Sequence, residues 1–249
     1  MSKWLLILII LCGFAFAFPE KKKIKIFIAG DSTASIKETK AYPETGWGMP
    51  FVYFWDSLVT VDNRAKNGRS TKTFINEGLW QSIFSDAGEG DYIFIQFGHN
   101  DEVPTKKSYT TEEEFRNNLI KYIRESKSKK AIPVLLTPVA RRKFDSTGHI
   151  EGTHDVYSQI VRDVSASEKV VLIDLDKKSQ ALYQQFGPEY SKLLFLQLKP
   201  GEHPNYPEGK DDNTHFNELG ARLIAQLILR GINEKVPALA ERIIVPLKK

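Results

Sequence analysis

The sequence has very little cysteine, and this scarcity narrows the chemistry open to the protein. Among 249 residues there is one cysteine, Cys12, so a scaffold held together by internal disulfides is excluded. If the chain is cut after Ala17, the mature protein contains no cysteine. A nucleophilic cysteine and a zinc site made of thiolates are then excluded as well.

Long hydrophobic runs are also lacking. The apolar run at residues 4–11 follows Lys3 and is too short to cross a bilayer. Because the small residues Ala15 and Ala17 come after it, residues 1–17 are typical of a cleaved secretory signal peptide. We therefore expect a secreted or periplasmic protein with no transmembrane span in its mature chain. Two alternatives stay open: a buried N-terminal helix, or a lipid anchor on Cys12, although Leu11 stands where a lipoprotein usually has a small residue.

The sequence carries no strong excess of one charge. It has 35 Lys and Arg against 31 Asp and Glu, a net charge of +4. The basic run at residues 21–23 is too short to be a nucleic-acid-binding arm. This balance permits an acidic substrate but does not call for nucleic acid as a partner. The hydrophobic share of 41% and the charged share of 27% are those of an ordinary globular protein.

Several familiar site motifs are absent. There is no Gly-x-Ser-x-Gly elbow of the usual α/β-hydrolases, no phosphate loop and no Gly-x-Gly-x-x-Gly dinucleotide motif. His149 and His154 do not have the His-Glu-x-x-His spacing of a zinc protease. The sequence therefore predicts no cofactor and no metal.

What the sequence does contain is a regular alternation of apolar strands and amphipathic helices. The predicted strands are residues 24–29, 58–61, 92–97, 132–137 and 170–175, and the predicted helices are 49–57, 71–80, 111–128, 153–167 and 217–230. Strands that alternate with helices predict a parallel sheet covered on both faces, here in one domain over residues 18–249. Two long irregular stretches, 140–152 and 199–214, are candidate binding loops.

Polar residues gather where these strands end. Gly30-Asp31-Ser32-Thr33 follows the first strand, Asn67-Gly68-Arg69-Ser70 comes shortly after the second, Gly98-His99-Asn100-Asp101 follows the third, and Asp212-Asn213-Thr214-His215 precedes the last helix. Ligands of open α/β sheets bind outside the carboxyl ends of the strands. We therefore expect these four segments to meet at one edge of the sheet.

These residue types can support catalysis by a serine nucleophile. Ser32 is expected at a helix N-terminus, and its hydroxyl needs a base to become a nucleophile. His215 is the candidate base, and Asp212, three residues earlier, would orient its imidazole. The backbone N–H groups of Ser32 and Gly68 and the side-chain amide of Asn100 are candidate donors to an oxyanion.

Taken one at a time, these segments also have structural interpretations. Gly68 is ordinary in a turn, Asn100 is suited to capping, and residues 212–215 fit the start of a helix. His99 is a tempting second base, but we expect a structural histidine there. Asp31 adjoins Ser32 in the chain and would normally point away from it, so a structural role is favoured for this carboxylate as well.

The four segments together, in this order, resemble the SGNH (GDSL) hydrolase superfamily. Its blocks supply Ser, Gly, Asn and His, which match Ser32, Gly68, Asn100 and His215, with Asp212 at the superfamily's Asp-x-x-His position. The longer strings Gly-Asp-Ser-Thr, Asn-Gly-Arg-Ser and Phe-Gly-His-Asn-Asp resemble the rhamnogalacturonan acetylesterase branch. The resemblance implies a flavodoxin-like, three-layer α/β/α fold with a five-stranded parallel sheet. It also implies a metal-independent esterase that removes acetyl groups from pectic polysaccharide.

The substrate is less clearly marked in the sequence. Arg141 and Arg142, just after the fourth strand, are candidate partners for the carboxylates of an acidic polysaccharide, although a solvated loop is the equal alternative. Several aromatic and histidine side chains are candidates for stacking on sugars: Tyr42, Trp47, Tyr157, His203 and Tyr206. Other acetylated glycans such as xylan, a lipid ester and a non-catalytic glycan-binding role are the alternatives. A lipid esterase would need a long apolar groove, whereas the loops here are polar and basic. The sequence gives no oligomeric state.

Overall fold

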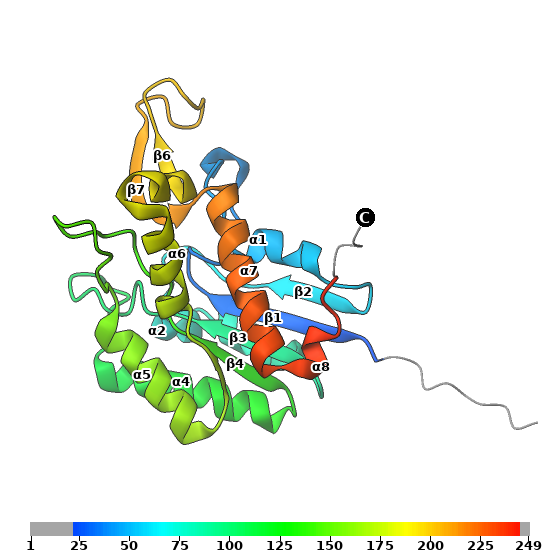
Figure 1. The fold of residues 1–249 in the computed structure, drawn as a ribbon. Helices are drawn as coiled ribbons and strands as arrows, with labels where there is room; N and C mark the ends of the chain where they lie inside the picture. The colour runs from blue at the N-terminus through cyan, green and yellow to red at the C-terminus, as the bar shows by residue number, and fades with distance from the viewer. Residues whose placement is uncertain (1–21, 245–249) are drawn as a thin grey trace, which may run out of the picture.

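The computed structural model describes residues 22–244, and five of its strands form one parallel sheet in the order β2-β1-β3-β4-β5 (Figure 1). The strands are β1 (Ile24–Gly30), β2 (Val59–Asn63), β3 (Tyr92–Gln96), β4 (Ile132–Leu136) and β5 (Val171–Ile173). All five predicted strands are confirmed, and their order is that of flavodoxin-like folds. The predicted signal peptide, residues 1–17 with Cys12, lies outside the described residues.

Helices cover both faces of this sheet, so the predicted three layers are confirmed (Figure 1). One face carries α1 (Gly48–Phe51), α6 (Leu175–Tyr190), α7 (Glu218–Lys235) and the short α8 (Pro237–Ala240). The other face carries α2 (Thr71–Asn76), α3 (Leu79–Asp86), α4 (Glu112–Ser128) and α5 (Asp155–Glu168). Short 3-10 helices span Thr39–Ala41, Val52–Phe54 and Ser191–Leu194.

The alternation of side chains along β1 explains why there are two cores. Ile26 and Ile28 point to one face and pack in the core that includes α7, whereas Phe27 and Ala29 point to the other and pack in the core that includes α4. All four side chains are fully buried. Successive residues of a strand face opposite sides, so a strand covered on both faces must be apolar throughout, as this one is.

Two predicted helices differ from the structure. The helix expected over residues 71–80 is wrong as a single element, because the chain ends α2 and starts α3 around Gly78, whose φ of 72° is left-handed. The helix expected over 49–57 is shortened to α1 and one 3-10 turn, after which Trp55 is extended. By contrast, the helix expected over 111–128 is confirmed as α4, and its start is capped because Thr111 Oγ1 accepts the N–H of Glu114 at 3.1 Å.

The sequence did not predict α6 or the hairpin that follows it. Strands β6 (Phe195–Leu198) and β7 (Lys210–Phe216) pair antiparallel outside the main sheet, so the irregular stretch expected at 199–214 is wrong for residues 210–214. The strand β7 has the sequence KDDNTHF, which lacks an apolar alternation. Its extended form comes from pairing with β6 and not from residue propensity.

The register of the sheet brings the polar segments to one edge, as predicted. Gly30 at the end of β1 pairs with Gln96 at the end of β3, and Asn63 at the end of β2 pairs with Ile28. The hairpin is tied to this edge because Thr45 donates its N–H to the carbonyl of Phe216, at the end of β7, at 2.8 Å. Residues far apart in the chain thus become neighbours there.

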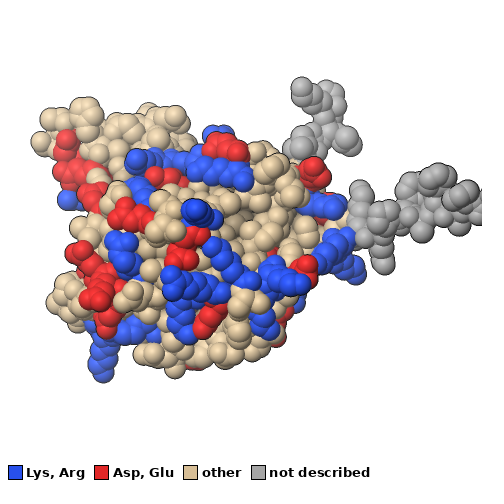
Figure 2. All heavy atoms as spheres, turned by 90° about the horizontal axis from the view of Figure 1, so that it is seen from below, with Lys and Arg blue, Asp and Glu red and all other residues tan. Residues whose placement is uncertain are grey.

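The surface seen from below in Figure 1 carries both charge signs. Figure 2 shows lysines and arginines interleaved with aspartates and glutamates over this face. Within residues 22–244, no helix combines the length and the apolar character needed to cross a membrane. In the same range, no group of three or more His, Cys, Asp or Glu side chains is arranged to hold a metal ion.

Candidate active site

The serine predicted as nucleophile lies in a tight turn directly after β1, and the expectation that a helix begins there is wrong. The carbonyl of Asp31 accepts the N–H groups of Ala34 and Ser35 at 3.3 and 3.1 Å, but the next helical residues begin only at Thr39. The reason is local: the Asp31 carboxylate accepts the N–H of Thr33 at 2.9 Å and its hydroxyl at 2.8 Å. Such side-chain bonds to the backbone compete with helix formation. Because no helix begins at Ser32, no helix dipole acts there, and an oxyanion would be stabilised by individual N–H groups only.

Ser32, His215 and Asp212 form a continuous chain of hydrogen bonds. The Oγ of Ser32 lies 2.9 Å from Nε2 of His215, and Nδ1 of His215 lies 2.8 Å from Oδ2 of Asp212. The side chains of His215 and Asp212 are 28% and 16% exposed. A nucleophile, a base and an orienting carboxylate are therefore in the contact that serine catalysis requires.

The hairpin holds Asp212 in its working orientation. Its Oδ1 accepts the N–H groups of Thr214 and His215 at 2.8 and 2.9 Å, while Oδ2 faces the imidazole. Burial by itself raises the pKa of Asp212, but the hydrogen bonds and charge of His215 and these N–H groups lower it below its ordinary range. The carboxylate is thus ionised when the imidazole needs a negative partner.

The loop that carries Gly68, residues 67–69, lies between the segments of the other two oxyanion donors. On one side, Asn67 Oδ1 accepts the hydroxyl of Ser35, close to Ser32, at 2.5 Å. On the other side, the carbonyl of Arg69 accepts Nδ2 of Asn100 at 3.1 Å. The three predicted donors are therefore brought together from the ends of three strands.

Gly68 has a conformational reason to be glycine. Its φ is 75°, in the left-handed region, and an added Cβ would meet nothing within 4 Å. No protein atom crowds this position, so lack of space for a side chain is not the reason for glycine. Glycine is needed because it adopts the left-handed backbone conformation easily, and this conformation sets the direction of the Gly68 N–H.

Asn100 is buried, with 6% of its surface exposed. The bond to the Arg69 carbonyl engages one N–H of its amide, and an amide NH₂ has two. The hydroxyl of Ser108 also donates to the Asn100 carbonyl at 3.1 Å, which fixes the backbone. The remaining amide N–H is the one available to an oxyanion.

His99 and Asp31 have the structural place that the sequence favoured. Both are buried, and Nδ1 of His99 lies 3.3 Å from Oδ2 of Asp31, away from the catalytic histidine. Burial raises the pKa of Asp31, but His99 and the Thr33 hydrogen bonds lower it to about 2. Burial, followed by the neighbouring His154, lowers the pKa of His99 to about 4. At neutral pH the pair is an ionised carboxylate against a neutral imidazole.

Sequence reasoning missed other polar residues that support the site. Gln96, at the end of β3, accepts the indole N–H of Trp47 at 2.7 Å and donates to the Thr33 hydroxyl at 3.2 Å. Asp101 accepts the N–H of Thr71, the first residue of α2, at 2.9 Å, and burial raises the pKa of Asp101 to about 7. No local signal marks such residues, because their roles depend on partners far away in the chain.

The two arginines proposed for substrate differ in their surroundings. Arg142 is held by the protein: its guanidinium donates to the hydroxyl of Ser191 and to Oδ1 of Asn213, both at 2.9 Å, and to the carbonyl of Pro188. Arg141 donates to the hydroxyl of Thr214, next to His215, at 2.5 Å, and its side chain is 32% exposed. Arg141 is therefore the better placed of the two to meet a substrate.

The candidate sugar-stacking residues also differ in how exposed they are. Trp47 is fully buried in the core and Tyr157 is 7% exposed, so Trp47 is a packing residue and Tyr157 has little surface to offer a sugar. Tyr42 is 41% exposed. Together with His203 it lines a hollow of about 590 Å³. The other residues that line this hollow are mostly apolar, and they include Ile36, which follows the nucleophile turn, and Tyr53.

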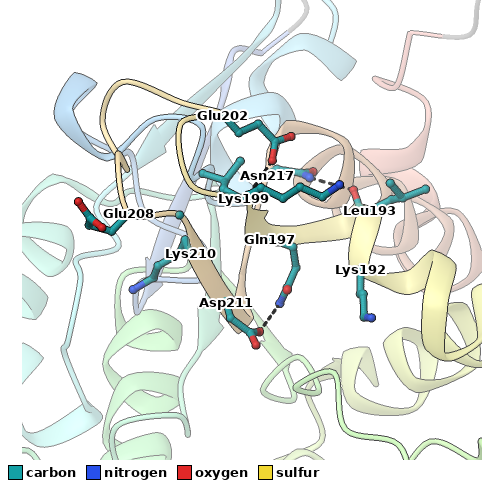
Figure 3. A pocket seen from close by; sticks show the side chains of 11 residues that line it. Lys192, Leu193, Gln197, Lys199, Glu202, Glu208, Lys210, Asp211 and Asn217 are labelled. Carbon is teal, nitrogen blue, oxygen red and sulfur yellow. Dashed lines mark hydrogen bonds between the residues drawn. The ribbon is translucent and has the colours of Figure 1, made fainter.

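A second hollow, of about 650 Å³, lies at the hairpin and does not include Ser32, Asp212 or His215 (Figure 3). Lysines and acidic residues surround it in Figure 3, among them Lys199, Lys210 and Glu202. Because its lining contains none of the three side chains of the candidate active site, this hollow is a separate feature of the surface.

The chain is similar to several known proteins. The model of the GDSL-like Lipase/Acylhydrolase family matches residues 28–223. Rhamnogalacturonan acetylesterase RhgT of Bacillus subtilis (strain 168) is 44% identical over 215 residues, 86% of this chain and 91% of that protein. The probable rhamnogalacturonan acetylesterase YesY of the same strain is 35% identical over 224 residues, 88% of this chain and 97% of that protein. The crystal structure of the YxiM protein from Bacillus subtilis has a TM-score of 0.74 at 29% identity, covering 86% of this chain and 57% of that one.

A parallel α/β sheet with these groups at its carboxyl edge defines a carboxylic ester hydrolase. The chain belongs to the GDSL-like lipase/acylhydrolase family, as the resemblance of its four segments predicted. The fold class and the enzyme class expected from the sequence are thereby confirmed.

Proposed function

We propose that the protein is a serine esterase that removes acetyl groups from pectic polysaccharide of the rhamnogalacturonan type. The observation that carries the proposal is the hydrogen-bonded chain from Ser32 Oγ through His215 to Asp212, with distances of 2.9 and 2.8 Å. The acetyl group and the polysaccharide are supported by the names of the relatives, rhamnogalacturonan acetylesterase RhgT and probable rhamnogalacturonan acetylesterase YesY.

The reaction proceeds in two steps. His215 Nε2 takes the hydroxyl proton of Ser32 while Oγ attacks the acetyl carbonyl carbon. The oxyanion accepts hydrogen bonds from the N–H groups of Ser32 and Gly68 and from Nδ2 of Asn100. The intermediate then breaks its bond to the sugar oxygen, which leaves with the proton from His215.

Water completes the cycle. His215, again neutral, takes a proton from the water that attacks the acetyl group on Ser32. The second oxyanion rests on the same donors, and its collapse breaks the bond to Oγ. Acetate leaves, and Ser32 regains its proton from His215. Every proton transfer uses the same imidazole nitrogen, which Asp212 keeps aimed at Ser32.

Two features of the protein suit an acidic polysaccharide. Arg141 offers a cationic fork beside the catalytic hairpin, and arginine pairs well with the carboxylate of a uronic acid. The hollow lined by Ile36, Tyr42 and Tyr53 offers apolar and aromatic walls, against which the apolar face of a sugar ring can pack.

The experiment measures acetate release from acetylated rhamnogalacturonan and acetylated xylan, and p-nitrophenol release from a long-chain p-nitrophenyl ester, with Ser32→Ala as the control. We expect release from the pectic substrate, and none in the variant. Preference for xylan would move the assignment to another acetylated glycan. Preference for the long-chain ester would make the protein a lipid esterase, and no release from any substrate would leave a non-catalytic glycan-binding protein.

Arg141 gives a test of the substrate within the same assay. A charge-assisted hydrogen bond contributes about 1.5–3 kcal/mol, so Arg141→Ala should reduce kcat/KM on the acidic polymer by roughly 10- to 150-fold. Hydrolysis of p-nitrophenyl acetate, which has no carboxylate, should change little. Equal losses on both substrates would instead assign the arginine a structural role. Lys143→Ala is the matched control, since it removes a basic side chain of the same loop that is 63% exposed and pairs with Glu151.

Export of the enzyme is part of the proposal. Residues 1–17 have the charge, apolar run and small residues of a signal peptide, and a polymeric pectic substrate lies outside the cell. Sequencing the N-terminus of the protein recovered from its native host tests this. A start at Phe18 supports cleavage and secretion, an acylated Cys12 means a lipid anchor, and an intact Met1 refutes the signal peptide.

A further inference from the structure

The ammonium group of Lys37 is buried beneath the nucleophile turn. Its side chain is 1% exposed, although lysine is among the residues least often buried. The ammonium has three N–H bonds, and the structure gives it three acceptors: the carbonyl of Ser32 at 2.5 Å, Oδ1 of Asn67 at 2.8 Å and Oε1 of Glu44 at 2.7 Å.

These acceptors belong to three separate parts of the site. Ser32 carries the nucleophile, and Asn67 precedes Gly68 in the oxyanion loop. Glu44 precedes Thr45, whose N–H holds the carbonyl of Phe216, the residue after His215. One ammonium group is therefore bonded to the nucleophile, to the oxyanion loop and to the segment that anchors the catalytic strand.

We propose that Lys37 is a positioning residue for the ester hydrolysis, which sets the distance between the Ser32 turn, the Gly68 loop and the base of the catalytic hairpin. The inference rests on the proposed function, because it assigns Lys37 to that reaction. It is supported by Ser35, whose hydroxyl binds the same Asn67 oxygen at 2.5 Å and faces the Ser32 carbonyl at 3.3 Å. The turn and the loop thus share two bridging residues.

The charge of Lys37 is suited to the task. Burial lowers its pKa, whereas Glu44, Asp31 and Asp212 oppose that shift. A cation among three carboxylates balances negative charge next to a site where an oxyanion must form. A neutral polar residue at position 37 would make hydrogen bonds but would leave the negative charge of the nearby carboxylates uncompensated.

A buried ion pair can also be a purely structural feature, and the partners of Lys37 allow the two roles to be separated. Glu44→Gln removes the ion pair but leaves the bonds to Ser32 and Asn67. Lys37→Met removes all three bonds at similar side-chain length. If Lys37 positions the catalytic groups, the two variants should differ in kcat even where both lose stability.

The experiment measures kcat and KM on p-nitrophenyl acetate, together with the urea unfolding midpoint. Displacement of catalytic groups by about an ångström costs on the order of 100-fold, so Lys37→Met should lower kcat about 10- to 100-fold with KM within about threefold. Glu44→Gln, which keeps the bonds of Lys37 to Ser32 and Asn67, should lower kcat less than Lys37→Met does. Arg162→Met, which breaks an ion pair with Asp174 and Asp176 elsewhere, is the control for stability loss alone.

Asn67 provides a second test in case Lys37→Met does not fold. This residue is exposed, so its variants should fold. Asn67→Ala removes the acceptor and should lower kcat by about 10-fold or more. Asn67→Asp keeps an acceptor oxygen for the ammonium and should retain more activity than the alanine variant.

Three results would overturn the inference: wild-type kcat in Lys37→Met, equal kcat losses in Lys37→Met and Glu44→Gln, or no difference between the two Asn67 variants. The proposed function fails in a different way. A wild-type enzyme that hydrolyses p-nitrophenyl acetate but releases no acetate from acetylated rhamnogalacturonan would refute the substrate and leave the test of Lys37 valid.

Discussion

Replacing Gly68 with alanine tests whether the oxyanion loop must keep its left-handed turn. An L-residue in this region of φ costs roughly 1–2 kcal/mol. Since an added Cβ meets nothing within 4 Å, steric clash contributes nothing further. The alanine also restricts the unfolded chain, which offsets about 0.4–1 kcal/mol. The net loss in the free energy of unfolding is therefore roughly 1 kcal/mol.

The effect on catalysis should be much larger than this loss of stability implies. The loop can relieve the strain by rotating the peptide before Gly68, and that rotation turns its N–H away from the oxyanion. Loss of one oxyanion donor lowers kcat by about 10²–10³. Gly68→Asn should lose less, because asparagine tolerates the left-handed region better than alanine.

Gly78 provides a matched control. Its φ is 72° against 75° for Gly68, and an added Cβ there also meets nothing within 4 Å. It directly precedes α3 and lies outside the four segments that carry the candidate catalytic residues. Gly78→Ala should therefore lose the same stability as Gly68→Ala while keeping its kcat.

The assay is kcat and KM on p-nitrophenyl acetate, with urea unfolding of each variant. The reasoning is refuted if both alanine variants keep wild-type kcat, or if both lose it equally. The first result would remove Gly68 from the oxyanion hole. The second would mean that lost stability, and not the N–H direction, lowers activity.

Three further predictions concern neighbouring groups. Ser32→Ala and His215→Ala should each abolish acetyl-ester hydrolysis with the fold intact by circular dichroism, and the double variant should be little worse than either, because the pair acts as a unit; additive losses would contradict this. Asn100→Ala should lower kcat about 10²–10³-fold, and an effect on KM alone would make Asn100 a substrate-binding residue. Because the pKa of His99 is lowered to about 4 and that of Asp31 to about 2, stability should fall by about 3 kcal/mol as the pH drops from 6.5 to 4, and further toward 2. Urea midpoints across that range should vary less in His99→Gln, and an unchanged slope would refute the assignment.

Much of this architecture could be predicted because local signals and global fold agree. The five strands are short apolar runs, and their alternation with helices predicts a parallel sheet. The flavodoxin-like order of the strands was implied by the resemblance to the SGNH superfamily. The candidate residues Ser32, Gly68, Asn100 and His215 lie in short strings near the strand ends, where an α/β sheet places its ligands, and the same resemblance joined them into one site.

The parts that could not be predicted depend on distant partners. Strand β7 is polar, and only its pairing with β6 makes it extended. The turn at Ser32 is not a helix because the Asp31 carboxylate binds Thr33. A lysine in a loop is ordinarily solvated, and nothing in the local sequence of Lys37 indicates burial against Asn67 and Glu44.

The candidate catalytic groups are divided between two parts of the fold. Ser32 and the candidate oxyanion donors follow strands of the main sheet, whereas Asp212 and His215 lie on a separate hairpin (Figure 1). The base of that hairpin is part of the main apolar core, because Phe195 and Phe216 are each 1% exposed and pack in the core that includes α7. Loss of packing in this core would therefore shift His215 relative to Ser32. The alignment of the proposed catalytic groups thus depends on apolar packing on one face of the sheet.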